Sequence, residues 1–153
     1  MLSMRSKYAL RACLALAQES PGHSILIADL AKKAQLPRKY LEAILLELRH
    51  GGFLTSRKGR GGGYLLSKPP AMISVGQIVQ ATDSPLVPSP CASRPESSLC
   101  SGCETDSGCG IQQIMSEVFQ AANIILDRTS LQDILDRESE VLQCYSNHSP
   151  AGL

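Results

Sequence analysis

Residues 37–67 read PRKYLEAILLELRHGGFLTSRKGRGGGYLLS, and this segment carries the clearest indications of the fold. Its first half carries apolar residues at spacings of three and four, which predicts a helix with one buried face. These residues are Leu41, Ile44, Leu45 and Leu48. Pro37 suits the first helical position, where no amide hydrogen is needed, and the glycines at 51–52 end the helix.

Beyond those glycines, two strand-like runs at 53–56 and 63–67 flank a loop that reads RKGRGGG. We predict a β-hairpin whose tip carries Arg57, Lys58 and Arg60. The glycines of the tip allow the backbone to take positive φ and to approach another surface closely. A phosphate-cradling loop explains this string less well, since no GxxxxGK[ST] motif is present and no helix opens directly after the glycines.

Upstream, the apolar pattern predicts helices over 3–18 and 28–34, with a short extended piece at 24–27 between them. A tight turn at 35–36 then separates the second helix from the helix that follows Pro37. Two helices joined in this way form a helix-turn-helix candidate, and the helix after Pro37 would be its recognition helix. The basic hairpin beside it has the geometry of a wing, which contacts phosphates or enters the minor groove.

The charge of the chain supports a polyanionic partner. The net charge is only +1, but residues 1–70 hold twelve Lys and Arg against four Asp and Glu, and residues 71–153 hold three against ten. No run approaches the roughly 18 apolar residues of a membrane span. The start MLSMRSKYALRA does not resemble a secretory signal. We therefore expect a cytoplasmic protein, whose six Cys serve as thiols or ligands.

Four of those cysteines lie within 19 residues, in a Pro-, Ser- and Gly-rich loop between the basic half and the last helices. They are Cys91, Cys100, Cys103 and Cys109. The Cys-x-x-Cys pair can share one metal centre, and Cys109 adds a third thiol. Such a site suits an iron-sulfur cluster. Structural zinc and a metal-free disulfide switch remain alternatives, because thiol spacing alone barely separates them.

The remaining cysteines and the histidines receive no ligand role. Cys13 lies in the first helix and is expected to be a small buried hydrophobe. Cys144 lies near the polar tail and is expected to be a free thiol. No Ser-His-Asp or Cys-His arrangement can be placed in the sequence, so we expect no enzyme.

A long amphipathic helix is predicted after Cys109. Its apolar residues recur at three and four over more than four turns, and they include Ile111, Ile114, Met115, Val118, Phe119, Ala122, Ile125 and Leu126. Only a short helix around Leu131 remains in the chain to cover this stripe, so a second copy of the protein is the expected partner. Packing against its own basic domain is the alternative, and the two can coexist. A symmetric dimer predicts a pseudo-palindromic DNA operator.

The string YLEAILLELRHGGFLTSRKGRGGGYLLSKPPAMISVGQIVQA, at 40–81, resembles the winged helix-turn-helix of the Rrf family of bacterial transcription regulators, which includes iron-sulfur cluster regulators. The YLE start, the GGGY-L wing and the following I-x-V-G helix occur in the family's order. The resemblance implies that Arg38, Lys39 and Tyr40 open the recognition helix at the major groove. It also implies that the Glu42 carboxylate accepts a hydrogen bond from a cytosine amino group. The same carboxylate would repel phosphate and thereby reject wrong sites.

The resemblance also implies a cluster-binding loop. Cys91, Cys103 and Cys109 fall where the family places its three cysteines. Gln112 stands where some members have a ligating His, so Cys100 is the candidate for a fourth ligand of a two-iron or four-iron cluster.

We therefore expect a mainly α fold, with a winged helix-turn-helix domain at 1–83 that contains a small β-hairpin wing. A Cys-rich sensor loop at 84–109, a dimerisation helix and short C-terminal helix at 110–143, and a flexible tail at 144–153 follow. The expected function is that of a homodimeric transcription regulator that binds double-stranded DNA and senses iron-sulfur cluster or redox status. The alternative is a cluster-free repressor governed by a thiol switch, zinc or a partner protein.

Overall fold

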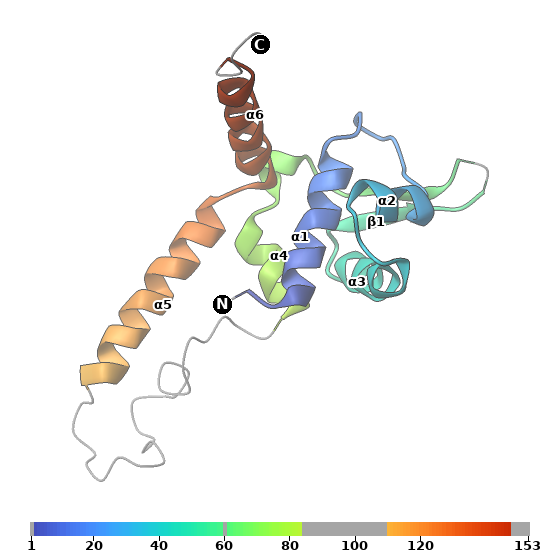
Figure 1. The fold of residues 1–153 in the computed structure, drawn as a ribbon. Helices are drawn as coiled ribbons and strands as arrows, with labels where there is room; N and C mark the ends of the chain where they lie inside the picture. Colours follow the sequence, from blue (N-terminus) through green and yellow to red (C-terminus); the bar gives the residue numbers. More distant parts are fainter. Residues whose placement is uncertain (1, 60, 84–109, 148–153) are drawn as a thin grey trace.

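The computed structural model describes residues 2–59, 61–83 and 110–147, with the backbone alone at 142 and 144–147. The described part of the chain is mainly helical and contains a two-stranded hairpin, as the sequence predicts (Figure 1). The elements, in order, are α1 (Met4–Ala17), α2 (Ile27–Lys33), α3 (Arg38–His50), β1 (Leu54–Arg57), β2 (Gly63–Leu66), the 3₁₀ turn η1 (Pro70–Met72), α4 (Val75–Thr82), α5 (Gly110–Arg128) and α6 (Leu131–Asn147).

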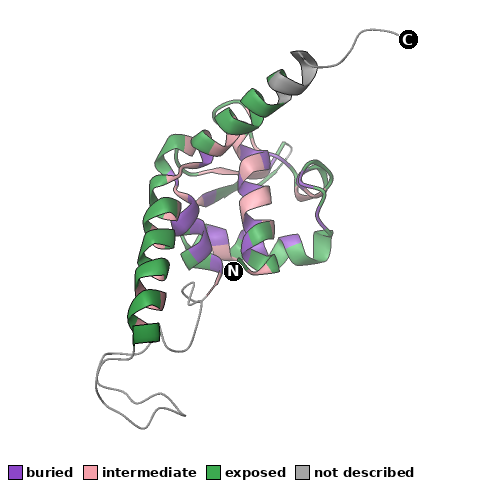
Figure 2. Ribbon diagram, turned by 60° about the vertical axis from the view of Figure 1, so that its left-hand side comes forward, coloured by how far each residue is buried: buried purple, intermediate pink, exposed green. Residues whose placement is uncertain are grey.

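The hydrophobic core lies among α1, α2, α3 and α4 (Figure 2). Helix α1 runs through it and contributes small side chains, including Ala9, Ala12 and Cys13, all of them fully buried. Small residues allow close approach of α3 and α4, whose larger side chains fill the remaining space. From α3 these are the four predicted residues Leu41, Ile44, Leu45 and Leu48. Cys13 is thus a buried core residue, as predicted.

Helix boundaries differ slightly from the predictions. Helix α2 begins at Ile27 rather than at residue 28, because the Leu26 carbonyl already accepts the amide of Leu30 at 2.9 Å. Pro37 is the N-cap of α3 and not its first helical residue, and its carbonyl accepts the amide of Leu41 at 3.2 Å. A proline fits there as well, since an N-cap needs no intrahelical amide bond.

The hairpin strands pair antiparallel, with Leu54 opposite Leu66 and Arg57 opposite Gly63. Strand β1 is shifted by one residue relative to the predicted run at 53–56, and β2 is one residue shorter than the predicted run at 63–67. In the piece predicted to be extended at 24–27, Ile25 forms an isolated bridge to Tyr64 of β2.

Two backbone hydrogen bonds attach the C-terminal helices to the winged domain. The Val75 amide donates to the Thr129 carbonyl at 2.8 Å, and the Leu131 amide donates to the Ile73 carbonyl at 3.0 Å. Leu131 is fully buried. Helix α6 extends to Asn147, beyond the short helix that the sequence predicts to end at 143. Its four additional residues occupy the start of the expected flexible tail.

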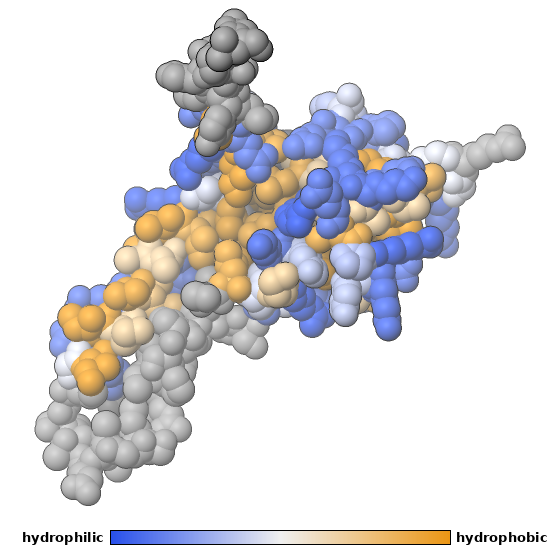
Figure 3. Space-filling model, viewed as in Figure 1, coloured by the Kyte–Doolittle hydropathy of each residue, from blue (hydrophilic) through white to orange (hydrophobic). Residues whose placement is uncertain are grey.

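The apolar stripe of α5 is divided between two environments. Met115, Phe119 and Leu126 are partly buried, and α5 packs beside α4 (Figure 1). Other apolar side chains of the helix remain exposed (Figure 3). They are Ile111, Ile114, Val118, Ile124 and Ile125, each more than half exposed. Packing against the chain's own domain therefore covers part of the stripe only. None of the described helices is long and apolar enough to cross a membrane.

Candidate nucleic-acid interface

Helices α2 and α3 form the predicted helix-turn-helix. Leu30, Ala34 and Leu36 are buried and hold the two helices together. The turn contains Gln35 in the left-handed region, at φ +52°, and Arg11 of α1 donates a hydrogen bond to its side-chain oxygen at 3.2 Å. This tight turn fixes the direction in which α3 leaves α2.

The start of α3 presents its polar side chains to solvent. Arg38, Lys39, Tyr40 and Glu42 are all exposed, and Tyr40 retains 60% of its accessible surface. The Arg38 Nε donates to Glu42 Oε1 at 3.1 Å, one helical turn along. The free amide groups at a helix start favour anions, and two cationic side chains add to that attraction. This end of α3 therefore suits a phosphate backbone, and Glu42 orients Arg38 within it.

The wing carries its cations at a tip whose backbone conformation depends on glycines. Arg57 and Lys58 are exposed, whereas Arg60 lies outside the described residues. Gly59 and Gly61 have φ of +97° and +78°, as predicted for the tip. Gly62 is buried against the turn, where a Cβ atom would lie 2.5 Å from the Arg57 carbonyl oxygen. The hairpin thus requires glycine for its conformation and for its close packing.

Sequence reasoning missed how the wing is attached to the loop between α1 and α2. The Ile25 amide donates to the Tyr64 carbonyl at 2.9 Å, and the Tyr64 amide donates to the Ile25 carbonyl at 2.8 Å. A Cβ atom on Gly63 would lie 2.1 Å from the Ile25 carbonyl oxygen, so only glycine admits this approach. The strand-like piece at 24–27 was the available signal, but the sequence did not identify its partner.

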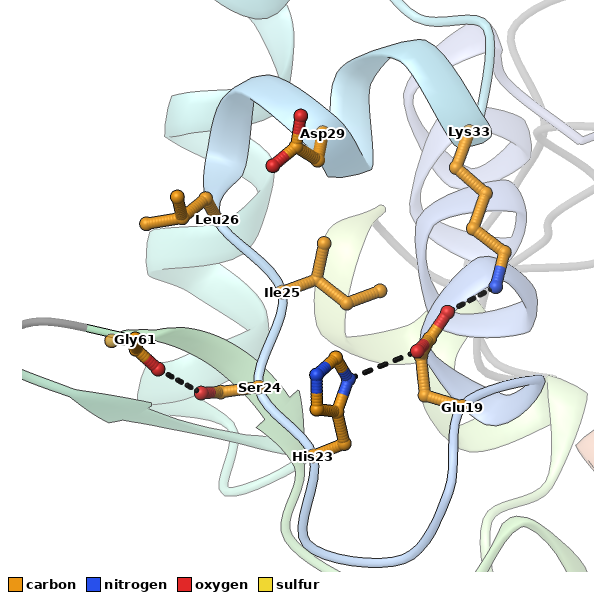
Figure 4. Close-up of a pocket in the computed structure, with 9 residues that line it drawn as sticks. Glu19, His23, Ser24, Ile25, Leu26, Asp29, Lys33 and Gly61 are labelled. Atoms are coloured by element: carbon orange, nitrogen blue, oxygen red, sulfur yellow. Dashed lines mark hydrogen bonds and ion pairs between the residues drawn. The ribbon is translucent and has the colours of Figure 1, made fainter.

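An open hollow of about 450 Å³ lies between this loop, α2 and Gly61 and Gly62 of the wing (Figure 4). Glu19 lies at its edge and is paired with both His23 and Lys33. The hydrogen bond from Lys33 and, to a smaller degree, the neighbouring His23 lower the pKa of Glu19. Since Lys33 belongs to α2, the loop is thereby tied to α2 as well as to the wing.

A second polar cluster lies where the winged domain ends. The Ser6 hydroxyl donates to Asp83 Oδ2 at 2.7 Å and lies 3.0 Å from the Thr82 hydroxyl. Hydrogen bonds from Ser3 and Ser6 lower the pKa of Asp83. Asp83 is the last described residue before the Cys-rich segment, so this segment leaves the domain from a point anchored to the start of α1.

The predicted metal ligands Cys91, Cys100, Cys103 and Cys109 lie outside the described residues. Among the side chains that the structure describes, no group of three or more His, Cys, Asp or Glu is arranged to hold a metal ion. Burial raises the pKa of Cys13 to about 12, which keeps it a neutral thiol and a poor ligand. Cys13 is therefore excluded from the candidate thiolate centre, and the four loop cysteines remain its predicted donors. Four soft sulfur donors fit an iron-sulfur cluster or zinc.

Comparison with known proteins finds a matching family model and similar transcriptional regulators. The model of the Rrf2 family, described as iron-dependent transcriptional regulators, matches residues 2–137. An rrf2-like HTH-type transcriptional regulator of Rhodobacter capsulatus is 37% identical over 138 residues, which cover 88% of this chain and 92% of that protein. The transcriptional regulator IscR of Escherichia coli is 27% identical over 141 residues, with coverage of 92% and 83%.

Among solved structures, the global cysteine regulator CymR of B. subtilis superposes with a TM-score of 0.74 at 23% identity. The superposition covers 90% of this chain and 97% of CymR. At that identity the likeness establishes the shared fold.

Proposed function

This chain belongs to the Rrf2 family of transcriptional regulators, and we propose that it is a homodimer that binds operator DNA through α3 and the wing. The family consists of regulators and not of enzymes. Such a regulator acts where the chromosome is, which in a bacterium is the cytoplasm.

The exposed start of α3 is the observation that carries the DNA-binding proposal. Its exposed side chains can reach base edges and phosphates, while the opposite face of the helix is buried in the core. These side chains are Arg38, Lys39, Tyr40 and Glu42. The hairpin that follows adds Arg57, Lys58 and Arg60 as wing cations. The Arg49 guanidinium lies 3.4 Å from the Ser56 hydroxyl and connects the end of α3 to β1. A helix for the major groove and a basic wing then belong to one unit.

The uncovered side of α5 supports the homodimer. Ile111, Ile114, Val118 and Ile125 recur at helical spacings and are exposed in the single chain. Burying such a stripe against a second copy removes apolar surface from water, which is the main driving force of association. A twofold axis through α5 would repeat the α3–wing unit, and the operator would be pseudo-palindromic.

We propose Cys91, Cys100, Cys103 and Cys109 as the ligands of an iron-sulfur cluster. The donor chemistry fits, and the description of the matching family as iron-dependent regulators supports this choice. A bound cluster supplies a centre whose presence depends on iron and redox conditions. The protein's own contribution is the attachment of the loop at both ends, to Asp83 through Ser3 and Ser6 and to α5 at Gly110.

A cluster-free regulator is the second candidate. Four thiols within 19 residues can also hold zinc or form a reversible disulfide. The regulator would then respond to thiol oxidation or to a partner protein.

Anaerobic purification separates these two candidates. Brown protein with visible charge-transfer absorption and about one cluster per protomer, as expected for four thiolate ligands, supports the cluster. Colourless protein with stoichiometric zinc, or with no metal, supports the alternative. Neither result alters the DNA-binding proposal, which has its own test.

For DNA binding, the wing variant carrying Gln in place of Arg57, Lys58 and Arg60 should bind duplex DNA more weakly and with a flatter salt dependence. Fluorescence anisotropy on a duplex selected from a random library measures both quantities. The control replaces Lys7, Arg128 and Arg137 by Gln, which changes the charge equally on α1, α5 and α6. If the wing variant bound as tightly as the wild type, the wing would not belong to the interface.

A further inference from the structure

Arg57 differs from the other wing cation that the structure describes in what its side chain contacts. Its Nη1 donates a hydrogen bond to the Gly22 carbonyl oxygen at 2.9 Å. Gly22 has φ of +80°, and this conformation belongs to the turn between α1 and α2. Arg57 therefore connects the end of β1 to a loop that is 35 residues away in sequence.

The other side of the hairpin is joined to the same loop. The Ser24 hydroxyl donates to the Gly61 carbonyl at 2.8 Å (Figure 4). One residue later, Ile25 exchanges two backbone hydrogen bonds with Tyr64 of β2. The segment Gly22–Ile25 thus contacts both arms of the hairpin, on either side of the tip that carries Lys58.

This segment is also held by contacts outside the hairpin. The His23 Nδ1 lies 3.0 Å from Glu19 Oε2, and Lys33 pairs with the second oxygen of the same carboxylate (Figure 4). The His23 amide also donates to the Ser20 carbonyl at 3.0 Å. Because Lys33 belongs to α2, the loop is consequently braced against the first helix of the helix-turn-helix.

Building on the proposed DNA-binding function, we propose that Gly22–Ile25 is a clamp that positions the wing relative to the helix-turn-helix. Arg57 and Ser24 are its positioning residues. Lys58, beyond the clamp, contacts the phosphates. A two-stranded hairpin is only marginally stable alone, so an unclamped wing must lose conformational freedom when it meets DNA. The clamp removes that cost in advance, which is the general benefit of preorganisation.

Three single variants of the full chain separate positioning from direct contact. Arg57→Gln removes the bond to Gly22, and Ser24→Ala removes the bond to Gly61 without a change of charge. Lys58→Gln is the matched control, with the same loss of charge as Arg57→Gln one residue further along. Thermal unfolding monitored by circular dichroism verifies that each variant is folded.

The first measurement is amide hydrogen exchange of Ile25 and Tyr64 in the DNA-free protein. Because each amide is protected by the bridge between the loop and β2, Arg57→Gln and Ser24→Ala should speed its exchange about fivefold, the loss typical of one weak hydrogen bond. Lys58→Gln should leave it unchanged. This readout decides whether the clamp exists even if the protein proves not to bind DNA.

The second measurement is the salt dependence of duplex binding. Lys58→Gln should reduce the slope of log K against log salt by about 0.9 for each phosphate that the side chain neutralises in the wild type. Arg57→Gln and Ser24→Ala should weaken binding about fivefold at every salt concentration, with the wild-type slope, as the removal of one weak hydrogen bond predicts. Unchanged exchange in both clamp variants, or a slope in Arg57→Gln as flat as in Lys58→Gln, overturns the proposal. Absence of duplex binding by the wild type instead refutes the proposed function.

Discussion

Gly76 of α4 faces Asp127 of α5 so closely that a Cβ atom on Gly76 would lie 1.9 Å from Asp127 Oδ1 and 3.2 Å from the Asp127 amide nitrogen. The glycine is therefore what lets the end of α5 approach the start of α4. The hydrogen bond between the Val75 amide and the Thr129 carbonyl lies beside this contact. The position of the long helix depends on the lack of a side chain at residue 76.

Replacing Gly76 by Ala should destabilise the protein by about 1–2 kcal/mol, since overpacking outweighs the helix propensity that Ala gains. Urea unfolding measures the free energy. In an Asp127→Ala background, the same replacement should cost less, because the carboxylate that blocks the Cβ atom is gone. Equal costs in the two backgrounds would show that the contact with Asp127 is not what excludes a side chain.

The exposed side of α5 gives a prediction for assembly. Val118→Asp places a charge within the proposed dimer interface and should raise the dimer dissociation constant by at least about a hundredfold, because each copy must bury an unpaired carboxylate. Sedimentation velocity detects the monomer. Met72→Asp is the control, since Met72 is 66% exposed on η1. Equal dissociation in both variants would argue against α5 as the interface.

The pair of Arg38 and Glu42 gives a prediction for specificity. Glu42→Gln removes the charge that repels phosphate and weakens the hold on Arg38. Binding to random duplex should therefore become tighter, and discrimination against mismatched operators should fall by about 1–3 kcal/mol, the value of one good base contact. Competition binding with random and selected duplexes measures both effects. Unaltered discrimination would remove Glu42 from the set of base readers.

Asp83 makes stability depend on pH. Hydrogen bonds from Ser3 and Ser6 lower its pKa in the folded protein. The contribution of Asp83 to the free energy of unfolding is thus fully present above the ordinary Asp pKa of about 3.9. It is lost as the pH falls through the lower, folded-state pKa.

Asp83→Asn should cost about 1 kcal/mol at neutral pH, as expected for a hydrogen-bonded group. It should also make the free energy of unfolding fall less steeply as the pH drops through the ordinary Asp pKa. Urea unfolding between about pH 3 and 7 measures this pH dependence. Asp136→Asn, on the exposed side of α6, is the comparison variant. A decline as steep in Asp83→Asn as in the wild type would contradict this role.

Cys13 should resist modification in the folded protein. With its pKa raised to about 12 by complete burial, only about one molecule in ten thousand carries the thiolate at pH 8. Alkylation by iodoacetamide, followed by mass spectrometry of the peptides, should leave Cys13 unmodified until the protein is unfolded with denaturant. Rapid labelling of Cys13 under native conditions would show that α1 opens readily.

The local elements of this protein can be read from its amino-acid sequence. The spacing of Leu41, Ile44, Leu45 and Leu48 predicted α3 and its buried face, and the glycines of 59–63 predicted the wing turn. Such features are readable because helical periodicity and positive φ are properties of neighbouring residues. The candidate recognition residues Arg38, Lys39, Tyr40 and Glu42 are exposed as a direct result of that periodicity.

The contacts between groups that are distant in sequence become visible only in the folded chain. Arg57 bonds to Gly22, Ser6 bonds to Asp83, and Gly76 admits Asp127, across separations that no local pattern encodes. The same holds for α5, where the apolar stripe was visible in the sequence but its division into a docked and an exposed part was not. Periodicity reports that a side chain is to be buried. The partner that buries it is selected by the packing of the whole chain.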